Sequence, residues 1–306
     1  MKGTRAERLA FLALVGGATG IGFAPVLVRL SETGPTATAF YRLLFALPLL
    51  WAWMRLDSSR EPEATRRGRL TRRELWHLGL TGLLFTADLS IWHWSLQLTS
   101  VTNSTLVANI APLFVTLGAA FFLGERITGE FLLGMTLAIG GGIQLAGASY
   151  SVSSQHLWGD LVALASAVFY AAYLLAVKQL RRTLPTPVIM AWVGLSSCLG
   201  FGLVAWLSGD VMWPATPRGW GVLIALAMIS HVGGQTLIAY GFGHLPASFS
   251  SVTLLVQPVV ASGVAWWILG EKLSAAQALG ACVVLTGIAV AGGWGGMAWR
   301  AWRRGS

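Results

Sequence analysis

Charged residues are scarce in this chain. Asp, Glu, Lys and Arg together make up 11% of its 306 residues, whereas soluble domains carry about 25%. Hydrophobic residues make up 55%, and they are grouped in runs with short polar breaks between them. The composition therefore excludes an ordinary soluble domain and favours an all-α protein that crosses the membrane many times.

Motifs for metal, nucleotide and redox chemistry are absent as well. The sequence contains two cysteines, Cys198 and Cys282, and no CxxC, HExxH or P-loop pattern. Both cysteines fall inside apolar runs, where cysteine behaves as a small buried hydrophobe. No spacing defines a nucleophile with its base either. We therefore expect no metal, no cofactor and no catalytic residue.

Ten apolar runs have the length that a membrane span requires. A helix needs about 20 mostly apolar residues to cross the bilayer core, and the loops between the runs are too short for a soluble domain. The first run lacks the cleavage pattern of a signal peptide. Capping boxes, Thr71 with Glu74 and Ser274 with Gln277, begin two of the runs. The predicted spans are 9–28, 36–56, 75–98, 104–123, 130–148, 158–178, 187–208, 219–242, 248–269 and 275–297.

The net charge of +9 is explained by the orientation of these spans. If the N-terminus lies in the cytoplasm, most of the 21 Lys and Arg residues fall on the cytoplasmic side, above all in the arginine-rich segment 55–73. Cytoplasmic loops of membrane proteins are enriched in Lys and Arg. We therefore predict that both termini are cytoplasmic and that the chain has no nucleic-acid partner.

One unit of the sequence occurs twice. A Leu-Gly-Glu turn at 123–125 follows Pro112, and the same turn returns at 269–271 after Pro258, 146 residues later in each case. Each copy holds five predicted spans, an odd number, so the second copy must enter the membrane from the opposite side. We predict two inverted five-helix repeats, 1–148 and 149–306, an arrangement that suits alternating access.

Four prolines are candidates for hinges. Pro112 and Pro258 lie in the middle of their spans at equivalent positions of the two copies, Pro25 lies in the first span and Pro48 in the second. A proline inside a helix lacks the N–H donor and displaces the carbonyl four residues earlier. Because a freed carbonyl is costly in lipid, it should face a cavity or a partner. These positions fit either a gating element or a simple kink.

The fifth and tenth predicted spans carry stripes of small residues. Gly134, Ala138 and Gly142 are four residues apart in the fifth span, and Gly287 and Ala291 are four apart in the tenth. Small residues at this spacing let helices pack closely. We predict that these two spans form a scaffold or, alternatively, the contact of a homodimer.

Two charged residues lie deep in predicted spans. Asp88 is the only acid near the middle of a span, and Arg42 lies within the second span. Charges at this depth are costly and mark function by default. The long side chain of Arg42 allows an ion pair with Asp88. Three readings stay open: a static ion pair, proton coupling by Asp88, and recognition of a substrate's amine and carboxylate by the two charges.

Polar and aromatic residues at helical spacing predict a shared cavity. They lie three or four apart on five spans, so each set shares one helix face. A single residue of this kind more often bonds a neighbouring helix, but stripes on five spans favour a common cavity. The candidate cavity residues are Arg42, Asp88, Trp92, Thr105, Asn109, Thr116, Ser166, Tyr170, Tyr173, His231, Gln235 and Gln257.

The sequence resembles the drug/metabolite transporter superfamily and, within it, the EamA-type members. The resemblance rests on the motif that runs from Ala111-Pro112 to Leu123-Gly124-Glu125-Arg126, and on its second copy, which ends in Gly270-Glu271-Lys272. It covers nearly the whole chain and implies ten helices in two five-helix repeats around a central cavity. Within the family, the chain looks most like bacterial exporters of aromatic and other neutral amino acids.

The resemblance and the residue pattern together predict a secondary transporter of the inner membrane that exports amino acids or similar small amphipathic metabolites by alternating access. The expected partners are a small-molecule substrate and the lipid bilayer. A drug or nucleotide-type metabolite carrier of the same superfamily is an alternative, although the single deep arginine, Arg42, argues against cargo with several phosphates. A membrane-embedded enzyme is a further alternative.

Overall fold

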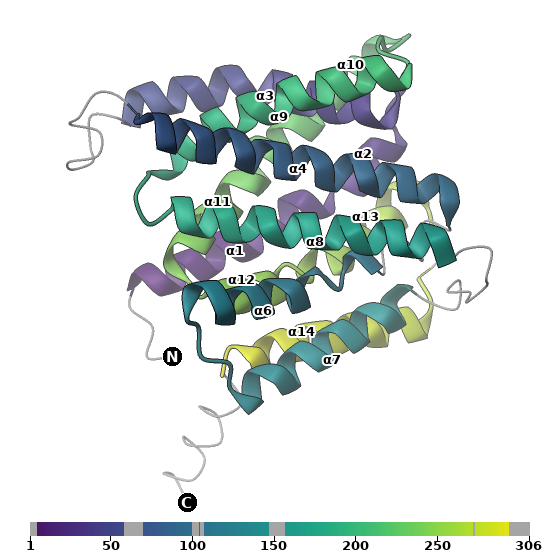
Figure 1. The fold of residues 1–306 in the computed structure, drawn as a ribbon. Helices are drawn as coiled ribbons and strands as arrows, with labels where there is room; N and C mark the ends of the chain where they lie inside the picture. Colours follow the sequence, from purple (N-terminus) through teal and green to yellow (C-terminus); the bar gives the residue numbers. More distant parts are fainter. Residues whose placement is uncertain are drawn as a thin grey trace, which may run out of the picture.

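The computed structural model describes residues 5–57, 70–99, 104, 107–146, 157–271 and 273–293, and within these ranges every regular element is a helix (Figure 1). The helices are α1 (Arg5–Gly22), α2 (Ala24–Arg29), α3 (Pro35–Asp57), α4 (Arg72–Leu98), α6 (Ala111–Leu123), α7 (Gly129–Ala146), α8 (Leu157–Leu180), α9 (Thr186–Ser208), α10 (Pro217–Ala225), the π-helical segment η2 (Leu226–Gln235), α11 (Thr236–His244), α12 (Ala247–Thr253), α13 (Val256–Leu269) and α14 (Ala275–Ala291). Both predicted capping boxes are confirmed, at the starts of α4 and α14.

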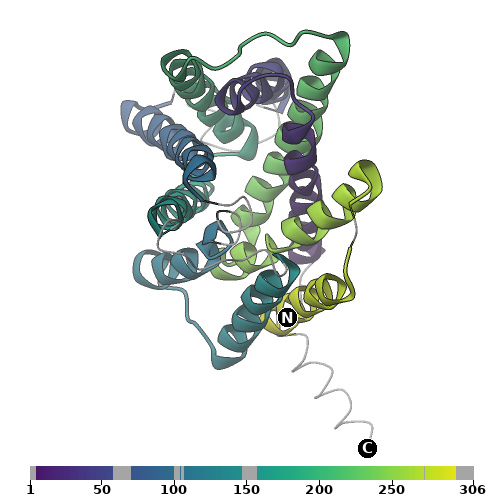
Figure 2. The same cartoon turned by 90° about the vertical axis from the view of Figure 1, so that its right-hand side faces the viewer.

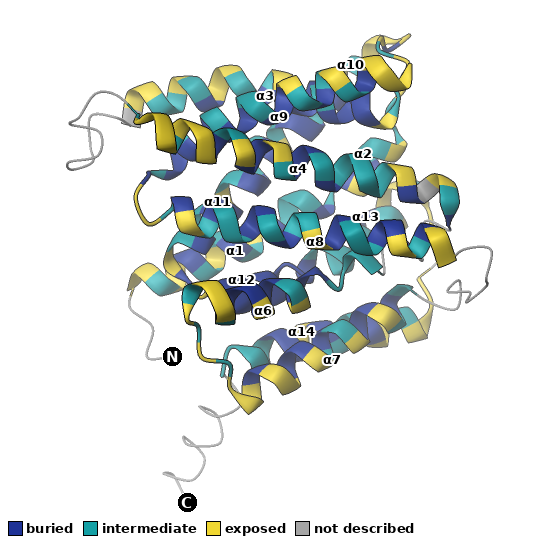
Figure 3. Cartoon of the chain, viewed as in Figure 1, coloured by how far each residue is buried: buried dark blue, intermediate teal, exposed yellow. Residues whose placement is uncertain are grey.

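The helices form one bundle. α4 packs against α8 and α9, α3 packs against α9, and α1 packs against α11 and η2. α6 lies against α8 and α12, whereas α7 and α14 pair with each other at one edge of the bundle (Figures 1 and 2). All seven residues of α12 are buried, so this short helix lies in the interior (Figure 3).

Helical residues lie in each of the ten predicted runs. α4 has 27 residues and occupies the third run. Its Trp, His and Asp side chains make it less apolar than the segments that qualify as membrane spans. Two shorter apolar helices, α6 and α14, match the fourth and tenth runs. The segments that are long and apolar enough to cross a membrane are Arg5–Arg29, Pro35–Leu56, Gly129–Ala146, Leu157–Leu180, Thr186–Ser208, Pro217–His244 and Ala247–Leu269.

The number of crossings and their orientation stay predictions. Most of the basic segment 55–73, the predicted outer loop 147–156 and the C-terminal residues 294–306 lie outside the described residues. Lys272, which belongs to the second copy of the repeated motif, also lies outside them.

Three predicted spans are interrupted beside their prolines. α1 ends at Gly22 and α2 begins at Ala24, directly before Pro25. α6 begins one residue before Pro112, after a turn at Asn109 and Ile110.

The ninth span is divided in the same way before Pro258. α12 ends at Thr253 and α13 begins at Val256, so the break falls at Leu254 and Leu255. The carbonyl of Leu254, which a proline four residues later frees, accepts from the backbone N–H of Gln257 at 2.9 Å. The prolines therefore mark helix breaks, and their role as hinges stays a prediction.

The small residues of α7 and α14 bring the two helices into close contact. A Cβ atom at Gly134 would collide with the backbone of Gly287 and Ala291, and one at Gly287 would collide with Gly134 and Ala138. Gly142 has open space around it. The contact face of α7 continues from Ala138 to Gly141, three residues further along the helix, and leaves out Gly142. The stripe therefore packs within one chain as a scaffold, and a homodimer through these helices stays a prediction.

The two Leu-Gly-Glu turns make different contacts. Gly124 has a positive φ of 68°, which glycine adopts without strain, and Glu125 follows it. The Glu125 carboxylate accepts from the backbone N–H groups of Ala247 at 2.6 Å and Ser248 at 3.0 Å, and from the Ser248 hydroxyl at 2.6 Å. It therefore caps the start of α12, 122 residues further along the chain.

The second copy of the acid has an exposed partner instead. Glu271 forms an ion pair with Arg29 at the end of α2, and both side chains are largely accessible to solvent. Exposed ion pairs contribute little to stability, whereas a carboxylate that satisfies the N–H groups of a buried helix start contributes more.

We expect Glu125→Ala to lower the free energy of unfolding by about 1–3 kcal/mol, because three donors at the start of α12 lose their acceptor. The matched variant Glu271→Ala should cost less than about 1 kcal/mol. Thermal unfolding of the purified protein in detergent measures both. Equal losses for the two variants would contradict the difference between the two turns.

Candidate functional site

Charged and polar side chains from four elements meet in the interior of the bundle. Arg42 comes from α3, Asp88 from α4, Tyr170 and Tyr173 from α8, and His231 from η2. Arg42 and Asp88 are each 7% exposed, and Tyr173 and His231 are each 2% exposed. Arg42 interacts electrostatically with both tyrosines and with His231, and Asp88 interacts with both tyrosines. The predicted cavity residues of these elements therefore lie together.

Asp88 is bonded to the neighbouring helix α8. Its Oδ1 accepts from the Ser166 hydroxyl at 2.7 Å. The ion pair with Arg42, one of the three readings of the sequence, is not formed in this structure, since Arg42 and Asp88 are both described and their charged atoms are not within ion-pair distance. Similar depth along two helices brings side chains together only when both also face each other, and α3 packs on α9 rather than on the Asp88 face of α4.

Arg42 reaches toward η2 instead. Its Nη2 donates to the backbone carbonyl of Ser230 at 3.2 Å. Its Nε is buried and has no hydrogen-bond partner in the described part of the chain. The guanidinium stays protonated in proteins, so a positive charge lies in the interior, and no carboxylate of the described residues lies within ion-pair distance of it.

Asp210 fixes the start of the helix that carries Arg42. Its carboxylate accepts from the backbone N–H of Thr36 at 2.8 Å and of Ala37 at 2.9 Å. Burial opposes the ionisation of Asp210, but hydrogen bonds from Thr36, Ala37 and Ser208 outweigh burial and lower its pKa. α3 therefore begins at a defined position, 174 residues away in sequence from the acid that caps it.

Aromatic rings pack against one another near these groups. Phe85 packs against Tyr173 and His231, with ring centroids 4.9 Å and 6.3 Å apart, and Tyr170 stacks on Tyr173 at 6.2 Å. Gln235 Nε2 donates to the Tyr173 hydroxyl at 2.7 Å. This bond holds α8 against η2 and fixes the orientation of the tyrosine ring.

The π-helical segment η2 is a feature that sequence reasoning missed. A π-helix bonds each carbonyl to the N–H five residues later, and such segments are frequent at functional sites. His231 and Gln235 were predicted to share a face at α-helical spacing, but they lie in this wider turn. The available signal is Gly234, whose Cβ would collide with Ile21 and Gly17 of α1. Glycine there permits the close approach of α1.

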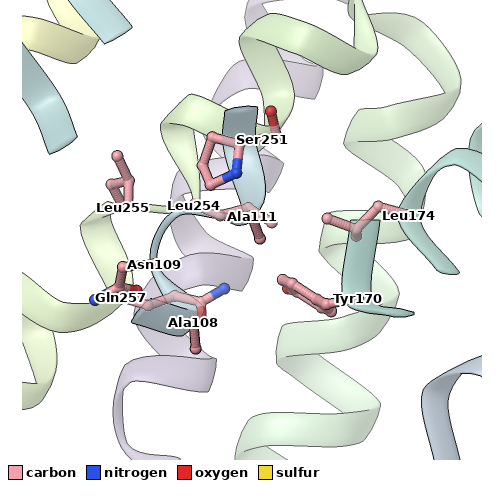
Figure 4. A pocket seen from close by; sticks show the side chains of 10 residues that line it. Ala108, Asn109, Ala111, Tyr170, Leu174, Ser251, Leu254, Leu255 and Gln257 are labelled. Atoms are coloured by element: carbon pink, nitrogen blue, oxygen red, sulfur yellow. The ribbon is translucent and has the colours of Figure 1, made fainter. Parts of the chain in front are cut away.

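A small pocket lies between the two interrupted spans. It is bordered by the turn before α6 and by the break between α12 and α13, and Figure 4 shows Asn109 and Gln257 on one side and Tyr170 and Leu174 on the other. Three residues that were predicted from separate spans, Asn109, Tyr170 and Gln257, therefore line one pocket.

Other predicted cavity residues lie elsewhere. Trp92 is half-buried on α4 and packs against His93, with ring centroids 5.4 Å apart. The Thr116 hydroxyl contacts Met135 Sδ of α7 at 3.6 Å. Thr105 lies outside the described residues. The structure thus joins the candidates of α3, α4, α8 and η2, and shows no contact of Trp92 or Thr116 with that group.

Two halves of the chain match one family. The model of the EamA-like transporter family matches residues 8–145 and again residues 157–293. The chain therefore belongs to the EamA-like transporter family, and with it to the drug/metabolite transporter superfamily. Together with its apolar helices, this makes the protein a multi-pass membrane transporter rather than a member of an enzyme family.

Characterised and inferred exporters are among its relatives. The pseudopaline exporter CntI of Pseudomonas aeruginosa is 26% identical over 71% of this chain and 74% of that protein. A probable terminal-alkyne amino-acid exporter of Streptantibioticus cattleyicolor is 31% identical over 69% of each chain. A solved crystal structure with a TM-score of 0.77 covers 92% of this chain and 96% of that chain at 21% identity, which shows a shared fold.

We expect the stability of variants to reveal which partner Asp88 has. In a double-mutant cycle, Asp88→Asn with Ser166→Ala should show a larger coupling free energy than Asp88→Asn with Arg42→Gln, because only the first pair shares a hydrogen bond. The first coupling should be about 1–3 kcal/mol. Thermal or chemical unfolding in detergent measures both cycles. Recovery of wild-type stability in the Asp88→Asn, Arg42→Gln double variant would show that the two charges are paired after all.

Proposed function

We propose that this protein is a secondary transporter of the inner membrane that exports amino acids or similar small amphipathic metabolites by alternating access. The observation that carries the proposal is the pocket at the breaks of two repeat-related spans, beside Tyr170. Broken helices in membrane transporters commonly form the substrate site, because their irregular backbone is tolerated where it lines a cavity.

The arrangement of the two repeats supports alternating access. We propose that 1–148 and 149–306 are inverted copies with both termini in the cytoplasm. In the contact of α7 with α14, Gly134 meets Gly287 and Gly141 meets Gly280. In the second repeat, Gly280 is the equivalent of Gly134, and Gly287 is the equivalent of Gly141. Gly134 therefore contacts the equivalent of Gly141, and Gly141 contacts the equivalent of Gly134. A two-fold axis between antiparallel helices produces this reciprocal pattern.

The surroundings of the site favour small amphipathic cargo. The rings of Phe85, Tyr170 and Tyr173 offer apolar surface, and Arg42 and Asp88 offer one charge of each sign. The names of two relatives mention export, in one case of an amino acid. A metabolite with an apolar part and few charges fits these groups, and an amino acid is such a metabolite.

Asp88 has two possible roles in transport. Its carboxylate is buried and is not neutralised by Arg42, so it either binds a substrate amine or carries the coupling proton. Intramembrane acids serve both purposes in transporters. Ser166 orients the carboxylate in either case.

We expect the purified protein in liposomes to exchange labelled amino acids saturably and without chemical change. If Asp88 carries the coupling proton, Asp88→Asn should abolish accumulation driven by a pH gradient and keep exchange. If Asp88 binds the amine, both should fall while the protein stays folded. Asp160→Asn, which changes an acid in the first turn of α8, is the matched control and should keep both activities.

Conversion of the labelled compound would favour an enzyme and overturn the transport proposal. Normal exchange and normal accumulation in Asp88→Asn would exclude both roles for this acid.

We expect the two Leu-Gly-Glu turns to lie on opposite sides of the membrane. In a background with Cys198 and Cys282 replaced by serine, Arg126→Cys should react with an impermeant thiol reagent from the cytoplasmic side. Leu273→Cys, next to the second turn, should react from the outer side. Labelling of both positions from one side would rule out inverted repeats.

A further inference from the structure

The charge of Arg42 has no counter-ion among the residues that the structure describes. The guanidinium donates one hydrogen bond, to the Ser230 carbonyl, and its buried Nε has no partner in the described chain. Asp88 accepts a hydrogen bond from Ser166 and forms no ion pair with Arg42. An isolated charge in a low-dielectric interior is costly, and buried charges are normally paired. Among the described residues, no negative group therefore compensates Arg42.

His231 presents a second set of unused groups next to Arg42. It follows Ser230, the residue whose carbonyl Arg42 contacts, and it lies close to Arg42. Both ring nitrogens are buried, and neither has a hydrogen-bond partner within the described residues. A neutral imidazole offers one N–H donor and one acceptor. Two donors from different helices, Arg42 Nε and His231, are thus available to one ligand.

The fold holds these donors in place. Asp210 fixes the start of α3, which carries Arg42. The hydroxyl of Ser230 donates to the carbonyl of Gly20 in α1 at 3.0 Å, so the segment of η2 that carries His231 is fastened to α1. Positioned donors on rigid elements are typical of binding sites rather than of accidental voids.

We propose that Arg42 and His231 form a subsite for the carboxylate of the transported molecule. The inference rests on the proposed transport of small amphipathic metabolites and assigns their charged end. One carboxylate balances the charge of one guanidinium. A phosphate group carries close to two negative charges and would leave an excess of negative charge in the interior. The carboxylate oxygens accept from Arg42 Nε and from the His231 ring, and the apolar part of the cargo lies against Phe85 and Tyr173.

The donors are sealed from solvent in the present conformation, because the atoms without partners are buried. The carboxylate therefore reaches them in a state in which the helices around η2 have moved apart. Alternating access supplies such a state, and binding of the carboxylate removes the cost of the uncompensated charge. The subsite thereby couples occupancy to the closing of the bundle.

The test compares three probes that differ in their charged groups. L-phenylalanine has both groups, 3-phenylpropanoate lacks the amine, and L-phenylalaninamide lacks the carboxylate. Binding to the purified full-length protein is measured by calorimetry in detergent. The wild type should bind both carboxylates, and Arg42→Gln should weaken their binding about 10- to 100-fold, as loss of hydrogen bonds to a charged group does. Binding of the amide should stay unchanged by the substitution.

Two further variants separate binding from folding. Arg218→Gln removes an exposed arginine and should bind all three probes like the wild type. Arg42→Met should leave the melting temperature of the empty protein equal or higher, since it removes an uncompensated buried charge. A lower melting temperature would mean that Arg42 is a structural residue and would overturn the subsite. His231→Ala should weaken carboxylate binding while the amide is unaffected.

The outcomes distinguish this subsite from the proposed function. The subsite is overturned if the protein exchanges amino acids in liposomes and L-phenylalaninamide competes as well as L-phenylalanine. The transport proposal stays intact in that case. Binding of 3-phenylpropanoate that depends on Arg42, without any amino-acid exchange, supports the subsite and overturns amino-acid export. Failure of all three probes to bind the wild type overturns the subsite.

Discussion

An apolar interior offers no water to satisfy polar groups, and this constraint governs where the polar residues of the chain lie. The carbonyls freed before Pro112 and Pro258 and the charges of Arg42 and Asp88 all need partners from within the bundle. Helices that carry such groups pack with the faces that bear them turned toward a common centre. The pocket, the aromatic rings and the π-helical segment η2 are found at this centre because the groups that need partners are there.

The periphery and the centre differ in how well they are satisfied. At the periphery, Glu125 and Asp210 each cap a distant helix start, and the glycines of α7 and α14 let two backbones touch. At the centre, Arg42 Nε and both nitrogens of His231 have no hydrogen-bond partners among the described residues, and a few atoms elsewhere, such as Ser90 Oγ and His93 Nδ1, have none there either. Buried polar atoms without partners are rare in folded proteins. A rigid frame around an unsatisfied centre is what a protein that binds and releases a polar cargo requires.

Sequence patterns predicted the frame well, because hydrophobic runs, prolines and capping boxes act locally. The breaks before Pro25, Pro112 and Pro258 agree with the missing N–H of proline, although Pro48 lies inside α3 without interrupting it. Grouping of Asn109, Tyr170 and Gln257 was also predictable, since equivalent breaks in two repeats face each other.

The partner of Asp88 was not predictable, because spacing gives depth along a helix but not the direction in which its neighbour faces. η2 was missed for a related reason: no period in the sequence distinguishes a π-helical turn from an α-helical one. Both errors concern the site itself, where several helices together determine the geometry.

The most direct test of the account is a structure of the protein with a transported amino acid bound. The account predicts that one carboxylate oxygen lies within about 3 Å of Arg42 Nε, at hydrogen-bond distance, and that the His231 ring donates to the same carboxylate. A cargo carboxylate bound elsewhere, with Arg42 paired to Asp88, would contradict it.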